Sequence, residues 1–124
     1  MRDPIERVQA FQLAKEAMRV GRDDARRLAG DPLTQRLAGQ LLQTTASIAA
    51  NIAEGYSRGT TADRRKFLEY ALGSARESLV WYEAADHPAL EEREARLISI
   101  RRLLLTMIRT CRLSSAADQR KFEK

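Results

Sequence analysis

Long stretches of the chain place apolar residues every three or four positions, which is the spacing of a buried helix face. Three short segments interrupt this pattern, and each contains residues that end or begin helices. They are Gly30-Asp31-Pro32, the segment 55–60, and Asp86-His87-Pro88. The pattern therefore predicts four helices, over residues 4–29, 33–55, 61–86 and 90–114, followed by a polar tail, 115–124.

The interrupting residues also predict how the helices end and begin. Gly55 can adopt the left-handed conformation that stops a helix, and Thr60 with Asp63 three positions later makes a capping box that starts another. Gly30 suits a helix C-terminus, and Asp31 suits the N-cap of the helix that follows. No segment has the alternating, valine- or isoleucine-rich pattern of a strand, so the sequence predicts helices alone.

Four helices of this length, joined by short turns, must run antiparallel to their neighbours in the chain. We therefore expect one all-α domain over residues 1–124, folded as an up-down-up-down four-helix bundle. The first helix carries small side chains along one stripe, which allow a neighbouring helix to approach closely. This stripe consists of Ala10, Ala14, Ala17, Gly21, Ala25 and Leu28.

The third and fourth helices have wider apolar arcs than one bundle core requires. A bundle helix needs an apolar stripe of about 100° or somewhat more, and both arcs exceed this width. We expect self-association to cover the surplus, and the alternative is a monomer with an unusually thick core. The arc of the fourth helix consists of Leu97, Ile98, Ile100, Leu103, Leu104, Leu105, Met107, Ile108 and Cys111.

The second helix is unusual because residues 37–53 carry no charge. One of its faces presents mainly neutral amides and hydroxyls, where a solvated helix would normally carry Lys, Glu or Arg. We therefore expect this helix to be covered on most sides. The polar face consists of Gln40, Gln43, Ser47, Asn51 and Glu54.

Composition limits the classes of function that the chain can have. Its 124 residues have room for one core, and 44% hydrophobic and 31% charged residues are typical of a globular domain. The formal net charge of +5 permits an acidic partner without requiring one. The single cysteine cannot form an internal disulfide, and neither a signal peptide nor a membrane span is indicated. We therefore expect a cytoplasmic protein.

No catalytic, metal or cofactor site is indicated. We expect His87 to be an exposed loop residue, since one histidine and one distant cysteine make neither a metal set nor a nucleophile–base pair. Cys111 lies among apolar residues and is expected in the core. Trp81 with Tyr82 and Tyr70 forms an aromatic edge, which we expect in the core or at a subunit interface, with base stacking as the alternative. These observations favour a non-enzymatic protein without a cofactor.

Two groups of basic residues are candidates for contacts with nucleic acid. In an oligomer each group would be repeated once per subunit, which would turn a weak patch into a multivalent phosphate-binding surface. The alternative is that acidic neighbours such as Asp63, Glu69 and Glu94 neutralise both groups. The first group consists of Arg58, Arg64, Arg65 and Lys66, and the second of Arg101, Arg102, Arg109 and Arg112.

Two runs in the middle of the chain resemble the signature of a bacterial family. The matching residues are Ser47-Ile48, Asn51-Ile52-Ala53-Glu54-Gly55 and Arg58 in the first run, and Phe67-Leu68, Ala71, Gly73-Ser74 and Glu77 in the second. This family comprises four-helix bundle proteins first known from intervening sequences of 23S ribosomal RNA genes. It also includes the accessory variability proteins of diversity-generating retroelements.

The resemblance implies a cytosolic bundle that assembles into a homopentamer, with a proposed role in binding RNA or nucleoprotein and no established enzymatic activity. The alternative is a protein-only assembly module whose surface binds another polypeptide. Many relatives carry basic residues where Leu42 and Gln43 stand here, so the second helix of this chain has less positive charge.

We expect the polar residues shared with the family to be structural. Glu54 and Arg58 are expected to order the turn by ion pairing, and Asn51 and Ser74 to satisfy buried or cross-helix partners. Glu77 lies too far along the helix axis from Glu54 for the two carboxylates to act as an acid–base pair in one subunit.

Overall fold

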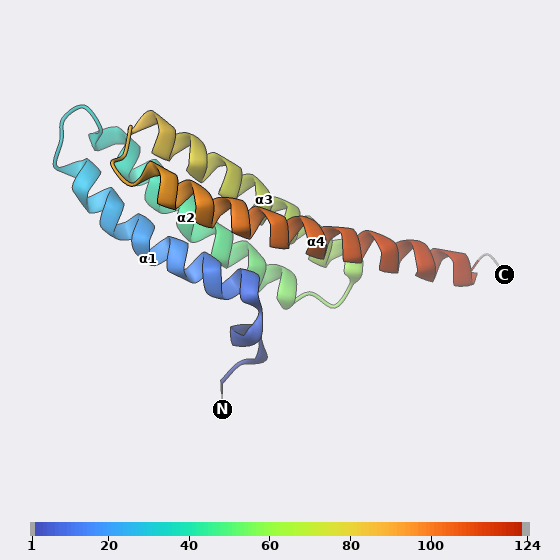
Figure 1. Cartoon of the computed structure of the whole chain (residues 1–124). Coiled ribbons are helices and arrows are strands. Elements are labelled where there is room, and N and C mark those ends of the chain that lie inside the picture. Colours follow the sequence, from blue (N-terminus) through green and yellow to red (C-terminus); the bar gives the residue numbers. More distant parts are fainter. Residues whose placement is uncertain (1, 123–124) are drawn as a thin grey trace.

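The computed structural model describes the backbone of residues 2–122 and the side chains of residues 2–116. Each α-helix packs against its neighbours in the chain, and α1 also contacts α4 along a sparser seam (Figure 1). The expected all-α, up-down-up-down bundle is confirmed. Its elements are the 3-10 turn η1 (Pro4–Arg7) and the helices α1 (Gln9–Ala29), α2 (Gln35–Tyr56), α3 (Thr61–Ala84) and α4 (Leu90–Phe122).

The N-terminal segment bends before α1 begins. Asp3 caps η1 by accepting a hydrogen bond from the Ile5 backbone N–H at 3.1 Å, and Val8 then takes an extended conformation. Lys15 of α1 reaches back to the Glu6 carboxylate at 2.6 Å, which holds the turn against the helix. The single helix expected from residue 4 is therefore divided into a short turn and a longer helix.

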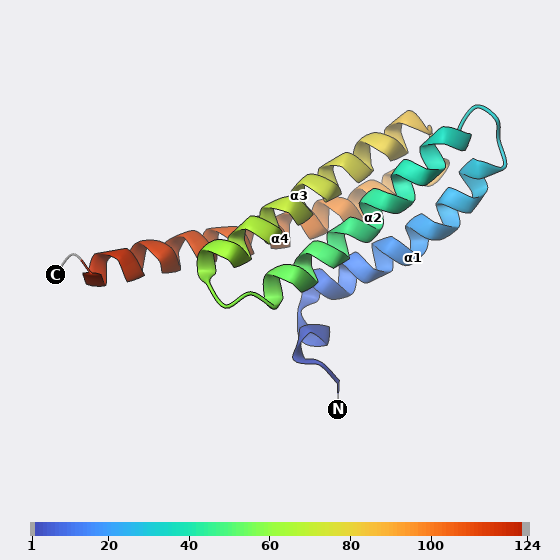
Figure 2. The same cartoon turned by 180° about the vertical axis from the view of Figure 1, so that it is seen from behind.

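The expected helix end at residue 114 is wrong, because α4 continues to Phe122 through most of the polar segment 115–124, whose last two residues lie outside the described part of the chain. The last turns of α4 project beyond the end of the bundle where α2 meets α3 (Figures 1 and 2). Residues 115–122 contain neither glycine nor proline. A polar composition does not end a helix when helix-breaking residues are absent.

The corner between α2 and α3 closes in a way that differs from the prediction for Gly55. No glycine in residues 2–122 has a positive φ, and α2 continues through Gly55 to Tyr56. A Cβ at Gly55 would lie 3.2 Å from the Arg64 carbonyl oxygen and 3.3 Å from the Phe67 Cβ. Glycine is therefore needed here for close packing of α3, and a left-handed stop is not formed.

Two other predicted caps have different outcomes. Thr60 begins α3 as expected, since its hydroxyl accepts a hydrogen bond from the Asp63 N–H at 3.2 Å. Asp31 instead accepts from the Leu33 N–H at 2.9 Å, and α2 begins only at Gln35. Asp31 thus stabilises the turn that precedes α2, and the prediction that it caps the helix is wrong.

The small-residue stripe of α1 is confirmed as a buried seam, since all six of its residues are buried. At its tightest point, Gly21 faces Thr45 of α2, and a Cβ built on Gly21 would lie only 2.9 Å from the Thr45 Cβ. The two helices can approach this closely only because residue 21 has no side chain.

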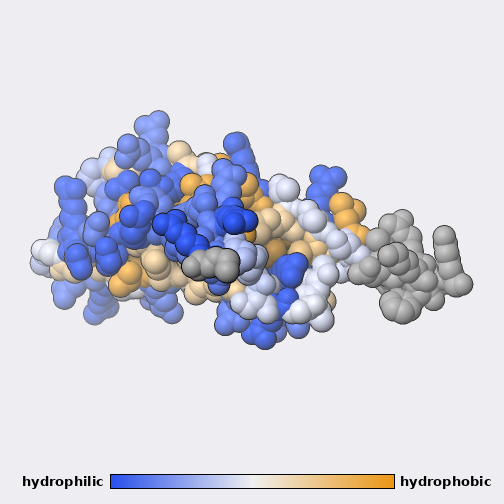
Figure 3. Space-filling model, turned by 90° about the horizontal axis from the view of Figure 1, so that it is seen from below, coloured by the Kyte–Doolittle hydropathy of each residue, from blue (hydrophilic) through white to orange (hydrophobic). Residues whose placement is uncertain are grey.

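Most of the wide apolar arcs of α3 and α4 is already buried within one chain. On α4, the buried positions include Leu97, Leu104 and Ile108, whereas Leu105 is 43% exposed. Figure 3 shows the face of the molecule on the side of the N-terminus, where hydrophobic side chains are visible between hydrophilic ones. The surplus that favoured self-association through α3 and α4 is therefore small, although Tyr70, Val80 and Leu113 also remain exposed.

Helix α2, whose residues 37–53 carry no charge, is not covered on most sides within one chain. It packs against α1 and α3, but Leu42 is 40% exposed, and Gln40, Gln43 and Ala50 are exposed as well. Between Arg36 and Glu54, the outer face of α2 is consequently exposed to solvent without charge, which is uncommon on a chain with 31% charged residues.

Candidate nucleic-acid interface

The corner between α2 and α3 combines basic and aromatic side chains. The helices are separated by residues 57–60, so the end of α2 and the first turns of α3 present their outer side chains on one surface. We call this surface the aromatic-basic corner. It consists of Tyr56, Arg58, Arg64, Lys66, Phe67 and Tyr70.

Two cations of the corner lie at contact distances from two adjoining rings. The Arg58 guanidinium lies 4.7 Å from the centre of the Phe67 ring, and Phe67 meets Tyr70 edge to face at 5.7 Å between centroids. The Lys66 ammonium lies 5.9 Å from the Tyr70 ring. Tyr70 is 51% exposed and Tyr56 is 41% exposed, so both rings are open to solvent. Such rings can stack on the bases of a single strand while the cations meet its phosphates.

Acidic neighbours neutralise only part of the first basic group. Arg58 pairs with Glu54 at 2.8 Å, which confirms the expected ion pair at the turn, and Arg65 lies 3.8 Å from Glu69. Within residues 2–116, Arg64 and Lys66 have no acidic partner. Their charges remain available to an anion from outside the chain.

A hollow of about 520 Å³ adjoins the corner. Tyr56 and Arg64 of the corner line it together with apolar residues from α2, α3, α4 and the position that follows η1. Its apolar lining residues are Val8, Ile52, Leu68 and Met107. The corner therefore borders an apolar depression that has one cation at its lining.

The structure divides the second basic group. Arg102 lines a groove between α1 and α4, whereas Arg109 and Arg112 line a groove between α3 and α4. Arg101 is half-buried on α4. Arg112 lies 3.3 Å from the Glu69 carboxylate, the same group that faces Arg65. Glu69 thus connects Arg112 to the first group, whereas Arg102 lies elsewhere.

Two of the polar residues shared with the family signature bond to Ser47, Asn51 within α2 and Ser74 across from α3. Ser47 accepts hydrogen bonds from the Asn51 side chain and from the Ser74 hydroxyl, both at 2.9 Å, which confirms the structural role expected for Asn51 and Ser74. One turn away, the Ser78 hydroxyl donates to Thr44 at 2.9 Å. Glu77 is exposed on α3 and forms no ion pair within residues 2–116.

A comparison with known protein families identifies the family of this chain. The family model described as 23S rRNA-intervening sequence protein matches residues 8–104, which is more than three quarters of the chain. The chain belongs to the 23S rRNA-intervening sequence protein family. No curated protein and no solved structure gave a match. The signature residues and the whole aromatic-basic corner lie inside the matched region.

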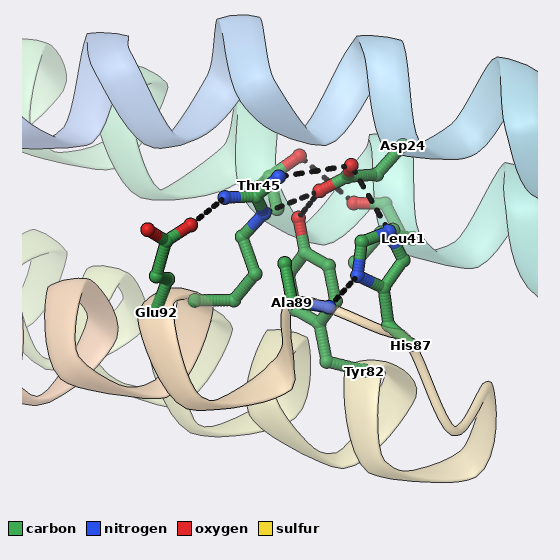
Figure 4. A network of polar contacts seen from close by, with 8 residues as sticks. Asp24, Leu41, Thr45, Tyr82, His87, Ala89 and Glu92 are labelled. Atoms are coloured by element: carbon green, nitrogen blue, oxygen red, sulfur yellow. Dashed lines mark hydrogen bonds and ion pairs between the residues drawn. The ribbon is translucent and has the colours of Figure 1, made fainter.

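This member of the 23S rRNA-intervening sequence protein family also contains a buried polar cluster that the sequence did not reveal. Asp24 of α1 accepts a hydrogen bond from the Tyr82 hydroxyl at 2.6 Å and another from Arg93 Nε at 2.8 Å (Figure 4). His87 Nε2 lies 3.1 Å from the other Asp24 oxygen. The cluster, which we call the Asp24 cluster, joins α1, α3, α4 and the loop between the last two. Its members are Asp24, Tyr82, His87 and Arg93.

The expectation that His87 is exposed is wrong, since only 5% of the residue is accessible. Asp86 has a φ of 48°, which turns the loop so that the imidazole covers the end of the bundle and meets the Tyr82 ring edge to face. His87 Nδ1 accepts the Ala89 N–H at 3.0 Å (Figure 4). Because Nδ1 is the acceptor, Nε2 of the neutral ring carries the proton, and it faces Asp24.

The remaining chemical candidates are structural. Cys111 is buried, as expected, and Tyr82 lies in the core. Trp81 is half-buried, whereas the exposure of Tyr70 excludes it from the core of one subunit. Residues 2–116 contain no cluster of acidic, His and Cys side chains suited to a metal, and none of the helices described over residues 2–122 has the length and hydropathy of a membrane span.

The Asp24 cluster makes stability depend on pH. Burial raises the pKa of Tyr82 above its ordinary 10.0, and the hydrogen bond to Asp24 raises it further. The stability that the protonated hydroxyl provides is therefore present below pH 10 and lost as the pH rises above it. Above pH 10 we expect the free energy of unfolding to fall by about 1.4 kcal/mol per pH unit more than in a Tyr82→Phe variant. Urea unfolding at pH 8 to 11 measures this difference, and parallel curves for the two proteins would contradict it.

Proposed function

We propose that the protein is a non-enzymatic, homo-oligomeric helical bundle, pentameric as the family resemblance implies, that associates with RNA or nucleoprotein through the aromatic-basic corner. The observation that carries the proposal is the exposed Tyr70 ring, held beside Phe67 and the free Lys66 ammonium. An exposed ring offers a face to an unpaired base, and the neighbouring ammonium offers a charge to its phosphate. The name of the matching family, which refers to intervening sequences of 23S rRNA, supports an RNA partner.

Binding to a fluorescein-labelled single-stranded oligouridine of about 20 nucleotides tests the proposal. We expect fluorescence anisotropy to show binding at 50 mM salt that weakens steeply towards 200 mM, because each phosphate contact releases counterions. An unlabelled RNA duplex of equal length should compete poorly, since its bases offer no free faces. Absence of binding at low salt would remove the proposal.

Two variants locate the contact on the corner. Tyr70→Ala is expected to weaken binding by about 1–3 kcal/mol through loss of one stacked base. Lys66→Gln should reduce the slope of log affinity against log salt by about 0.7. The matched controls are Val80→Ala, which truncates an equally exposed apolar residue of α3, and Arg36→Gln at the far end of α2. Equal losses in variants and controls would contradict the assignment to the corner.

Assembly is supported by the exposed, uncharged outer face of α2 more than by α3 and α4. A second copy would cover Leu42, Gln43 and Ala50 without burying a charge. Light scattering should then give about 70 kDa for a pentamer of the 14.0 kDa chain. Ala50→Arg should lower this mass, whereas Ser99→Arg on the exposed side of α4 should not. A uniform 14.0 kDa species for the unmodified chain would contradict assembly.

A protein-only assembly module is the second candidate, and the ion pairs of the corner favour it. Glu54 and Glu69 neutralise Arg58, Arg65 and, in part, Arg112, so fewer cations face solvent than the sequence offers. This candidate predicts the same oligomer without RNA binding at 50 mM salt. The anisotropy measurement therefore separates the two functions.

A further inference from the structure

Gly73 occupies an exposed position in the interior of α3 that the fold does not explain. A Cβ added at this residue would meet no atom within 4 Å outside its own helix turns. Glycine weakens a helix interior relative to alanine, because it costs more conformational entropy and adds no packing. Gly21 and Gly55 are explained by close contacts inside the chain, but nothing inside residues 2–116 fills the space at Gly73. The bare backbone there allows close approach from outside.

The space above Gly73 belongs to a groove between α3 and α4 with a volume of about 320 Å³. Three arginines line this groove, with Arg76 contributed by α3 and Arg109 and Arg112 by α4. Leu72, Leu105 and Ile108 form the apolar part of its lining. The groove thus brings three guanidinium groups to a section of helix where no side chain covers the backbone.

The charges that line the groove do not balance within residues 2–116. Among these residues, Glu69 is the only acidic one that lines it, and its carboxylate already faces both Arg65, at 3.8 Å, and Arg112, at 3.3 Å. Arg76 and Arg109 have no acidic partner within residues 2–116. The groove therefore carries a net positive charge that an anion can neutralise.

We infer that the groove between α3 and α4 binds a phosphate group, which approaches the backbone at Gly73 and is held by Arg76, Arg109 and Arg112. Guanidinium groups bind phosphate through paired hydrogen bonds, and three of them surround one small opening. A second copy of the chain is a less suitable occupant, because contact between copies would have to bury the unpaired Arg76 and Arg109. This inference deepens the proposed function, since it places a backbone phosphate of the RNA beside the bases stacked at the corner.

Titration with tripolyphosphate tests the groove without RNA. In two-dimensional NMR of the full-length protein, the Nε–Hε signals of Arg76, Arg109 and Arg112 and the Gly73 amide signal should shift. Gly73→Leu places a side chain in the open space and should abolish these shifts. Gly39→Leu is the matched control, because Gly39 is also an exposed helical glycine with no atom within 4 Å of an added Cβ, and it should leave them unchanged.

The oligouridine measurement then connects the groove to RNA. Gly73→Leu should weaken binding about tenfold, the loss expected for one charge-assisted phosphate contact, and Arg76→Gln should reduce the salt slope by about 0.7. Arg36→Gln and Gly39→Leu should leave both quantities unchanged.

The outcomes separate this inference from the proposed function. RNA binding without tripolyphosphate shifts in the groove would overturn the inference and leave the function standing. Shifts without RNA binding would support the phosphate site and remove the function. If Gly73→Leu lowers the molar mass in light scattering but leaves the phosphate titration intact, Gly73 lies between copies and the inference is wrong.

Discussion

Replacing Asp24 with alanine is expected to destabilise the bundle by about 3–5 kcal/mol, which is the usual cost of removing one partner from a buried ion pair. Asp24 is 6% exposed and receives hydrogen bonds from Tyr82 and Arg93. Without the carboxylate, the Tyr82 hydroxyl and the Arg93 guanidinium lose their partner while they remain inside the bundle. Urea unfolding followed by circular dichroism measures the change.

The neighbouring acid provides a control for this prediction. Asp23→Ala removes an exposed carboxylate whose nearest ion pairs are 3.8 and 3.9 Å long, and it should change stability by less than about 0.5 kcal/mol. Tyr82→Phe combined with Asp24→Ala should cost clearly less than the sum of the two single variants, because both then remove the same hydrogen bond. Additive losses would contradict the coupling.

The lowered pKa of Asp24 predicts how the stability of the unmodified protein, compared with an Asp24→Asn variant, changes at acid pH. Burial raises the pKa of this carboxyl, but the hydrogen bonds from Arg93 and Tyr82 and the nearby positive charges outweigh burial, so its pKa lies below the ordinary 3.8. The stability supplied by the ionised carboxylate is present above the ordinary pKa of 3.8 and is lost as the pH falls below 3.8 towards the lowered pKa of the folded protein. The unmodified protein should therefore lose its advantage over Asp24→Asn below about pH 4.

Gly21→Ala is the second substitution with a large expected effect. Its added methyl group should lower the free energy of unfolding by about 1–3 kcal/mol through overpacking. The new Cβ would lie 2.9 Å from the Thr45 Cβ and Cγ2 atoms, and Thr45 is only 1% exposed. These close contacts can be relieved only if α1 and α2 move apart along the whole seam. Chemical denaturation of Gly21→Ala gives the magnitude.

Gly39→Ala should raise the stability of the protein, whereas Gly21→Ala should lower it. No atom lies within 4 Å of a Cβ at Gly39 on α2, so alanine there should stabilise the helix by about 0.5–1 kcal/mol. A Gly21→Ala protein as stable as Gly39→Ala would show that the seam is looser than the structure indicates.

Much of the fold could be predicted because it depends on local patterns. The small-residue stripe with Gly21 and the Thr60 cap follow from spacing and from side-chain chemistry within a few residues. The Asp24 cluster could not be predicted in this way, since Asp24 and Arg93 are 69 positions apart and His87 reaches them only through the turn at Asp86. One signal was available: Asp24 lies three positions after Gly21 and four before Leu28, on the buried stripe, where an acid requires a partner.

The candidate site could be predicted in part. Both basic groups were visible in the sequence, but their division, and the position of Glu69 between Arg65 and Arg112, depends on how α4 crosses α3. The sequence interpretation groups Tyr70 and Tyr82 in one aromatic edge, yet the two residues are twelve positions apart. Their side chains therefore leave the helix at directions about 120° apart. One ring therefore lies in the core and the other faces solvent beside Lys66.

The sparse seam between α1 and α4 has a consequence for the order in which the chain folds. Each of the other three seams joins helices that are consecutive in the chain, so its contacts close short loops at low entropic cost. The seam between the first and last helices gathers residues from distant parts of the sequence, and the Asp24–Arg93 pair is its polar link. The helical hairpins can therefore form early, and the joining of the two terminal helices completes the native state.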